Sequence, residues 1–172
     1  MTKHRVLGVT GWKNSGKTTL VERLVRELTS RGWKVSTIKH AHHSFDIDKE
    51  GTDSFRHRQA GATEVAIVSG NRWALMHELR EELEPTLDEV LERIAPCDLV
   101  VVEGYKREGH TKIEVRRSAA KDTSPLAPLD PTIVAIATDH EVSQSNLPCF
   151  GLNEISAIAD FIENFSGLKR TD

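Results

Sequence analysis

The chain of 172 residues has little cysteine, few aromatic residues and no long apolar run. Its two cysteines, Cys97 and Cys149, lie far apart in apolar surroundings, so we expect two buried thiols and no disulfide framework. No apolar run approaches the roughly 18 residues of a membrane span. The stretch 6–9 is too brief for the core of a signal peptide. We therefore expect a cytoplasmic protein with no membrane partner.

An excess of charge of one sign is also missing. Lys and Arg total 23 against 26 Asp and Glu, a formal net charge of −3, which argues against a nucleic-acid-binding protein and confines any basic patch to a local stretch. Hydrophobic residues make up 38% and charged residues 28%, the balance of a globular chain. The length suits one domain, able to fold without a disulfide or a structural metal.

The first 38 residues have the pattern of a strand, a helix and a second strand. A short apolar run over 6–10 ends at Gly11. From Lys17 onward apolar residues recur at helical spacing until Gly32, a typical helix stop, and a second apolar run covers 35–38. Two strands joined by a helix in so few residues indicate a βαβ unit and hence a parallel sheet.

The rest of the chain continues this alternation with one elaboration. Runs at 65–68 and 73–76, joined at 69–71, predict a β-hairpin preceded by a short helix over 53–59. Thr86 and Glu89 have the spacing of a capping box at the start of a further helix. Strands are expected at 99–102, 113–115 and 133–137, and a last helix capped by Asn153. The proline-rich segment 116–132 reads as a long loop or flap.

The segment 11–18 matches the phosphate-loop pattern G-x-x-x-x-G-K-[ST] at every fixed position. It lies where that motif works, after the first strand and at the start of the first helix, so that backbone N–H groups and the helix dipole face an anion. Lys17 is expected to reach the β- and γ-phosphates, and the Thr18 hydroxyl to bind Mg²⁺. The expected nucleotide-binding residues here are Gly11, Lys13, Asn14, Ser15, Gly16, Lys17, Thr18 and Thr19.

These observations predict one α/β domain over 1–172 of the P-loop NTPase type, an open and mostly parallel sheet with helices on both faces and a hairpin elaboration. A nucleotide site of this type needs a carboxylate near Mg²⁺, usually at the end of a neighbouring strand. Glu103 stands where the apolar run 99–102 stops, so we expect it to serve there. Lys17 and Glu103 are thus the candidate catalytic residues, and Thr18 and Glu103 the candidate Mg²⁺ ligands.

A second group of polar residues follows the second strand, and three interpretations of it stay open. Histidines and carboxylates could bind Zn²⁺ or Ni²⁺, they could form a switch loop facing the γ-phosphate or another anion, or they could be a solvated loop. The placement beside the phosphate loop favours the switch loop. The residues of this second ligand pocket are His40, His42, His43, Asp46, Asp53 and Lys106.

Basic and aromatic residues near Glu103 also have two interpretations. The basic stretch 106–121 could seat a second anion or an acidic partner, or it could be a solvated hairpin. Trp73 and Tyr105 could stack on a planar ring, whereas a tryptophan in a strand is more often part of a core or an interface.

Several segments together resemble one known family, the molybdopterin-guanine dinucleotide biosynthesis protein B family. The similar stretches, in order and spacing, are Ile-Lys-His-Ala-His-His at 38–43, Asp46 to Ser54, Ala-Gly-Ala at 60–62, Arg-Trp-Ala-Leu-Met at 72–76, Val-Glu-Gly-Tyr-Lys at 102–106 and Ala-Thr-Asp at 137–139. The resemblance spans about residues 5–165.

The resemblance implies a GTP-binding accessory protein of molybdenum-cofactor maturation that assists the guanylyltransferase joining GMP to molybdopterin. It implies a homodimer with weak intrinsic GTPase activity, GTP and Mg²⁺ as cofactors, and molybdopterin or its guanylyltransferase as partner. The N-K-x-D motif that reads guanine in many GTPases is missing, and we expect Asp139, after the strand 133–137, to do related work.

Two other functions remain as alternatives. One is a metallochaperone-type GTPase that uses His40, His42 and His43, and the other is a small-molecule kinase covered by the basic flap. No obvious water-positioning Gln or arginine finger accompanies the phosphate loop, so we expect slow hydrolysis. We expect dimerisation through the hairpin around 65–76, because Trp73 and Met76 would otherwise leave an apolar surface.

Overall fold

The computed structural model describes residues 4–41, 45–142 and 145–169. The chain divides into two compact units, which we call the sheet unit (Met1–His40 with Val90–Asp172) and the hairpin unit (Ala41–Glu89). The expectation of one nucleotide-binding domain stays a prediction. Within the described ranges, no helix combines the length and the apolar character needed to cross a membrane.

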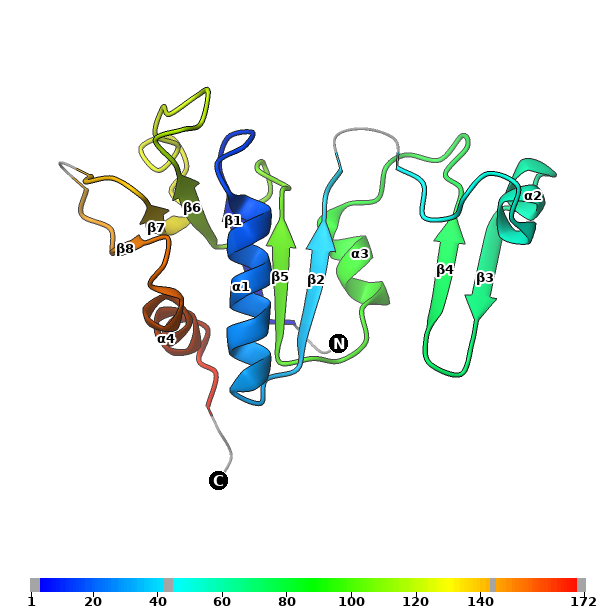
Figure 1. Cartoon of the computed structure of the whole chain (residues 1–172), viewed down its shortest axis with the longest axis horizontal. Coiled ribbons are helices and arrows are strands. Elements are labelled where there is room, and N and C mark those ends of the chain that lie inside the picture. The colour runs from blue at the N-terminus through cyan, green and yellow to red at the C-terminus, as the bar shows by residue number, and fades with distance from the viewer. Residues whose placement is uncertain (1–3, 42–44, 143–144, 170–172) are drawn as a thin grey trace. The chain divides into compact units, whose positions relative to one another are not determined.

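The sheet unit is built on six strands that are all parallel to their neighbours (Figure 1). Their order is β2-β5-β1-β6-β7-β8. The strands are β1 (Val6–Thr10), β2 (Val35–Lys39), β5 (Leu99–Glu103), β6 (Lys112–Arg116), β7 (Ile133–Thr138) and β8 (Cys149–Gly151). Since all six run the same way, their carboxyl ends meet at one edge, which is where ligands of open α/β sheets bind.

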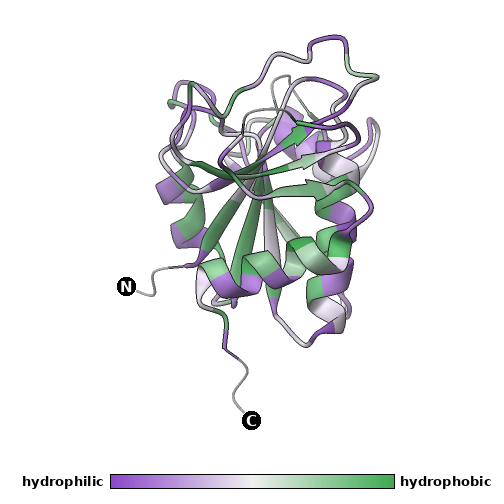
Figure 2. Ribbon diagram, turned by 90° about the vertical axis from the view of Figure 1, so that its left-hand side faces the viewer, coloured by the Kyte–Doolittle hydropathy of each residue, from purple (hydrophilic) through white to green (hydrophobic). Residues whose placement is uncertain are grey.

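Helices α1 (Lys17–Ser30) and α4 (Ile155–Ser166) pack against one face of this sheet. Leu20, Leu24 and Leu28 of α1 are buried against alternate strand residues such as Leu7 and Val101. Figure 2 shows the strands as largely hydrophobic and the helices as striped, with hydrophilic turns between hydrophobic ones. This is the pattern of helices that bury one side on a sheet.

The opposite face of the sheet carries buried charge over β6. Lys112 and Glu114 alternate with the apolar Ile113 and Val115, and all four are buried. Lys112 Nζ donates to Thr132 Oγ1 at 2.7 Å and lies 3.3 Å from an Asp130 carboxylate oxygen. Loop segments therefore cover this part of the face and supply the partners that buried charges need.

The hairpin unit contains α2 (Asp53–Gln59), β3 (Glu64–Val68) and β4 (Trp73–His77), and α3 (Leu87–Arg93) begins in it and ends in the sheet unit. The antiparallel pair β3–β4 confirms the predicted hairpin. Thr86 and Glu89 form the predicted capping box, with Glu89 N donating to Thr86 Oγ1 and Thr86 N to Glu89 Oε2. Arg58 ties the unit together through Asp46, Asp48 and Glu78.

Two local expectations were wrong, and one strand was missed. Glu154, not Asn153, is the N-cap of α4, because the Asn153 side chain accepts a hydrogen bond from Arg23 Nη1 at 2.9 Å instead. The free thiols are not buried, since Cys97 is half-buried and Cys149 exposed. Strand β8 was not predicted: it is only three residues long at the edge of the sheet, too short to show a periodic pattern.

Candidate nucleotide site

The loop between β1 and α1 has a tightly curled backbone with positive φ angles. Gly16 and Asn14 have φ angles of +94° and +63°, and Gly11 has φ +150°. A Cβ on Gly11 would lie 2.5 Å from the carbonyl oxygen of Val115, so a side chain there would displace the backbone of β6. The two glycines are therefore required by this loop geometry, which turns successive N–H groups inward.

The first turn of α1 has N–H groups available for an anion. Among the described residues no side chain caps this turn, and Gly16 occupies the N-cap position. The Ser15 hydroxyl is buried in the loop and has no hydrogen-bond partner within the part of the chain described. A helix start with free donors and a positive dipole end is a ready phosphate site.

Lys17 folds back over this loop. Its Nζ donates to the carbonyl oxygens of Gly11 at 3.0 Å and Trp12 at 2.7 Å. Burial lowers the pKa of the Lys17 ammonium, and the nearby ammonium of Lys106 lowers it further. These two carbonyl oxygens bind the Lys17 ammonium at the place where the phosphate oxygens of a nucleotide are expected to bind it.

Glu103, at the carboxyl end of β5, meets two residues of neighbouring elements. Thr18 Oγ1, in the first turn of α1, donates to Glu103 Oε1 at 2.8 Å. The same oxygen lies 3.5 Å from Lys39 Nζ, at the end of β2. Thr18 and Glu103 present a hydroxyl and a carboxylate side by side, the hard oxygen donors that Mg²⁺ prefers, so the residues present fit this ion. Lys39 was not predicted as a site residue, although its place at the end of a neighbouring strand could have suggested it.

Asp139 follows β7 at the same edge of the sheet. It accepts hydrogen bonds from Ser118 N at 2.7 Å and Ser118 Oγ at 3.0 Å, and His140 Nδ1 lies 2.9 Å away. The contacts with His140 and Ser118 lower the pKa of the Asp139 carboxyl to about 2. Asp139 lines an open surface cavity of about 610 Å³, whose other lining residues are 138, 140–142 and 149–153.

Only part of the expected second pocket lies beside the phosphate loop. The His40 ring packs against that of Tyr105 at a tilt of 36°, with ring centroids 4.5 Å apart, and the His40 backbone N–H donates to Glu103 O. A Cβ on Gly104 would lie 2.8 Å from that of His40, so the packing there is close. His42 and His43 lie outside the described residues.

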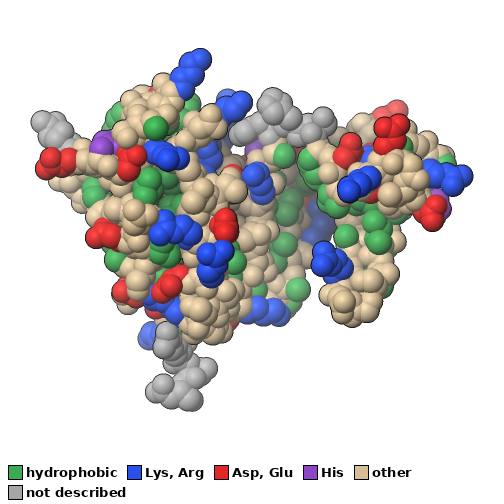
Figure 3. Space-filling model, viewed as in Figure 1, with side chains coloured by type: hydrophobic (Ala, Val, Ile, Leu, Met, Phe, Trp, Pro, Cys, Tyr) green, Lys and Arg blue, Asp and Glu red, His purple; other side chains and the backbone are tan. Residues whose placement is uncertain are grey.

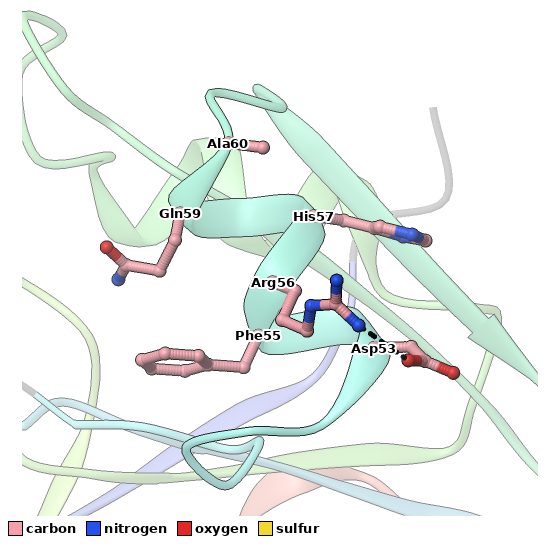
Figure 4. A pocket seen from close by; sticks show the side chains of 6 residues that line it. All are labelled: Asp53, Phe55, Arg56, His57, Gln59 and Ala60. Atoms are coloured by element: carbon pink, nitrogen blue, oxygen red, sulfur yellow. Dashed lines mark ion pairs between the residues drawn. The ribbon is translucent and has the colours of Figure 1, made fainter.

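Asp46 and Asp53 belong to the hairpin unit. Asp46 pairs with Arg58 at 2.9 Å. Asp53 lines an open hollow of about 500 Å³ along α2, where it lies 3.9 Å from Arg56 (Figure 4). Among the described residues, which omit 42–44, no three His, Cys, Asp or Glu side chains are grouped as metal ligands.

The basic stretch 106–121 splits into residues with different roles. The Lys106 ammonium lies 4.6 Å from the centre of the Trp12 ring, a cation–π contact. Lys112 is buried, and Arg116 pairs with the buried Glu114 at 2.8 Å. The interpretation of Lys112 and Arg116 as a solvated or ligand-seating surface was wrong, because both form internal ion pairs.

Two contacts of the loop 117–132 with the site were missed from the sequence. Trp12 Nε1 donates to Ser124 O at 2.7 Å, and Ser118 binds Asp139. Both contacts join residues that are far apart along the chain. The types of residue involved do not indicate in the sequence that they will pair.

The parallel sheet, with a phosphate loop leading from β1 into α1, defines an α/β protein of the P-loop NTPase type. The sequence profile of the family described as molybdopterin guanine dinucleotide synthesis protein B matches residues 6–139. The chain therefore belongs to that family, and the resemblance seen in the sequence is confirmed.

Curated relatives extend the similarity over nearly the whole chain. The molybdopterin-guanine dinucleotide biosynthesis adapter protein of Haemophilus influenzae is 41% identical over 162 residues, covering 93% of this chain and 88% of that protein. The Escherichia coli protein of the same name is 35% identical over 159 residues, covering 91% and 90%.

Solved structures confirm the fold. A MobB protein homolog from Bacillus stearothermophilus superposes with a TM-score of 0.71 at 28% identity, covering 96% of this chain and 99% of the other. A structure of molybdopterin-guanine biosynthesis protein B gives a TM-score of 0.73 at 27% identity, with 94% and 99% covered.

Proposed function

We propose that this protein is a GTP-binding adapter of molybdopterin guanine dinucleotide synthesis. The main observation that supports this proposal is the phosphate loop. In it Lys17 Nζ donates to the carbonyl oxygens of Gly11 and Trp12, and among the described residues no side chain caps the start of α1. The relatives at 41% and 35% identity, named as adapter proteins of this synthesis, support the pathway.

Lys17 and the N–H groups of 13–19 bind the β- and γ-phosphates in this proposal. Thr18 and Glu103 hold Mg²⁺, which when bound neutralises phosphate charge. Glu103 lies at the end of β5, where its carboxylate accepts a hydrogen bond from the Thr18 hydroxyl. Hydrolysis is slow in the protein alone, below about 1 s⁻¹.

The cavity beside Asp139 receives the guanine base. A carboxylate that stays ionised at neutral pH accepts hydrogen bonds from the adjacent N1–H and N2–H donors of guanine, a pair that adenine lacks. The low pKa of Asp139 and its position at the cavity wall support this role. Its hydrogen bonds with Ser118 orient the carboxylate.

The partners follow from the same assignment. We expect the protein to dock with the guanylyltransferase of the pathway or with molybdopterin itself, and to form a homodimer. The cytoplasm, where such a synthesis takes place, is the proposed location.

The test is calorimetric titration of GTP and of ATP, each with Mg²⁺, into the wild type and Lys17→Ala. We expect GTP binding by the wild type that falls at least about 100-fold in the variant, since a charged partner of the phosphates is lost. Lys34→Ala is the control, because Lys34 is an exposed lysine beyond the opposite end of β2. Equal binding of ATP would contradict the guanine assignment, and unchanged binding by Lys17→Ala would contradict the site.

A further inference from the structure

Lys39 and Glu103 are direct neighbours across two parallel strands. Figure 1 shows β2 beside β5, and the strand register pairs Lys39 with Glu103. Paired residues of adjacent strands share one face of a sheet. Val101, two residues before Glu103, is buried against α1, so Lys39 and Glu103 lie on the α1 face, at the edge where α1 begins.

One oxygen of Glu103 serves two partners at once. Oε1 accepts from Thr18 and lies 3.5 Å from the Lys39 ammonium. The Glu103 side chain is only 12% exposed, whereas that of Lys39 is 61% exposed. A poorly solvated carboxylate next to a phosphate site needs a positive partner, and the exposed Lys39 ammonium supplies it.

The backbone fixes this pairing. His40 N donates to Glu103 O at 2.9 Å, which extends the β2–β5 ladder past the last strand residue. Gly104 packs against His40 closely enough to exclude a side chain. The distance between the Lys39 and Glu103 backbones is thus set by the sheet, and the Lys39 side chain can leave the carboxylate without moving it.

The charge of Lys39 also contributes to the electrostatic environment of Lys17, the lysine expected to bind the phosphates. Besides burial and Lys106, the charge of Lys39 lowers the pKa of Lys17, while Glu103 raises it. The carboxylate and the three ammonium groups therefore act on the same small region, into which the phosphates of a nucleotide would enter.

We propose that Lys39 is the internal counter-ion of Glu103 and competes with a divalent cation for that carboxylate, so that Lys39 sets how strongly nucleotide binding depends on Mg²⁺. This inference rests on the proposed nucleotide site. Without a divalent cation, Lys39 shields the incoming phosphates from the Glu103 charge. With one present, the ammonium opposes the cation and is displaced toward solvent.

The measurable quantity is the ratio of two dissociation constants for a non-hydrolysable GTP analogue, one in excess EDTA and one in excess Mg²⁺. Lys39→Gln is expected to raise this ratio about 3- to 10-fold, the scale of one partly exposed ion pair. Most of the change comes from weaker binding in EDTA, where Glu103 has lost its shield. Lys39→Arg keeps the charge and should retain the wild-type ratio.

Two further experiments test whether the effect is specific to the pair of Lys39 and Glu103. Lys34→Gln removes the same charge beyond the other end of β2 and should leave the ratio unchanged. In a Glu103→Gln background, Lys39→Gln should no longer change the ratio, because the shared carboxylate charge is gone.

The proposal is overturned if Lys39→Gln weakens binding equally in EDTA and in Mg²⁺, which would make Lys39 a direct phosphate ligand, or if its effect persists with Glu103→Gln. If the proposed nucleotide site is itself wrong, the binding results differ from these. In that case the wild type binds the analogue in neither buffer, or Lys17→Ala binds it as well as the wild type does.

Discussion

His110 is a histidine held neutral by its surroundings. Both ring nitrogens are buried without a hydrogen-bond partner in the described structure, and the ring packs against Gly8, where a Cβ would come within 2.4 Å of Nε2. Burial, and then the neighbouring Lys112 ammonium, lower the pKa of His110 to about 4. Its ordinary value, near 6.5, applies in the unfolded chain.

This shift gives stability a definite pH dependence. Between about pH 6.5 and about pH 4 the unfolded chain takes up a proton that the folded chain refuses, so the free energy of unfolding falls as the pH falls. The loss amounts to about 2–3 kcal/mol and is complete near pH 4. Urea unfolding across this range should show a shallower pH dependence for His110→Leu than for the wild type.

His77 provides the control of opposite sign. Hydrogen bonds with Glu64, then with Glu82, raise its pKa, so its contribution is present below the ordinary value and is lost as the pH rises through the folded one. His77→Gln should therefore leave the acid-side slope in place. Parallel curves for the wild type and His110→Leu would show that His110 does not titrate as described.

Single residues were predictable where their chemistry depends on neighbours in sequence. The phosphate-loop glycines and Lys17 follow from spacing alone, since the eight consecutive residues 11–18 determine the loop. Lys112 was misread because its partner Asp130 lies in a loop that folds back over the sheet. A basic residue in a strand looks exposed until the loop that covers it is known.

The loop 117–132 has little regular structure, yet several hydrogen bonds fix it. The buried carboxylate of Glu114 accepts from Leu126 N at 2.8 Å and Ala127 N at 2.9 Å. Trp12 Nε1 binds its Ser124 carbonyl, and Asp139 binds its Ser118. The loop thus spans from the phosphate loop to the proposed base cavity.

Trp12→Phe tests how far the phosphate loop orders this segment. Phenylalanine keeps a smaller ring beneath Lys106, with a weaker cation–π contact, and loses the hydrogen bond to Ser124, worth about 1 kcal/mol. Amide hydrogen exchange in 117–132 should become about fivefold faster. Trp33→Phe is the matched control, because its Nε1 bonds to Glu163 on α4 instead. Unchanged exchange in 117–132 would mean that the other anchors suffice.

Elements were predicted best where they are long or follow a strong pattern. Helix α1 and strand β5 fill their faces with apolar residues at regular spacing, and both were located to within one residue of their ends. The order of the strands did not follow from these patterns, because adjacent strands such as β2 and β5 are separated by the whole hairpin unit.

The hairpin unit exposes apolar side chains that no described residue of the unit covers. Val68 and Trp73 are cross-strand partners, 75% and 71% exposed, and Leu75 lies beside them on the same face. Figure 3 shows hydrophobic side chains at the surface of this unit. The interpretation of Trp73 as a core residue of the single chain was wrong, whereas its place in an interface stays a prediction. The expectation that Met76 adds to this surface was also wrong, because Met76 is buried.

We expect the full chain to be a dimer at micromolar concentration, because burying such a face between two copies removes apolar area from water. Trp73→Ser with Leu75→Ser should weaken the dimer about tenfold or more, measured by analytical ultracentrifugation. Leu129→Ser is the control, since Leu129 is 84% exposed in the sheet unit. A wild type that sediments as a monomer would contradict the expectation.

The strand order also governs when the protein can fold during its own synthesis. The first strand pairs only with β5 and β6, so β1, α1 and β2 leave the ribosome several seconds before a partner strand exists, at about 5–20 residues per second. Pairings so distant along the chain are slow to form. The phosphate loop is translated almost first and completed late, since Glu103 must be in place before Thr18 and Lys39 find their shared carboxylate. A newly made chain therefore gains its nucleotide site only after more than half of its length has been translated.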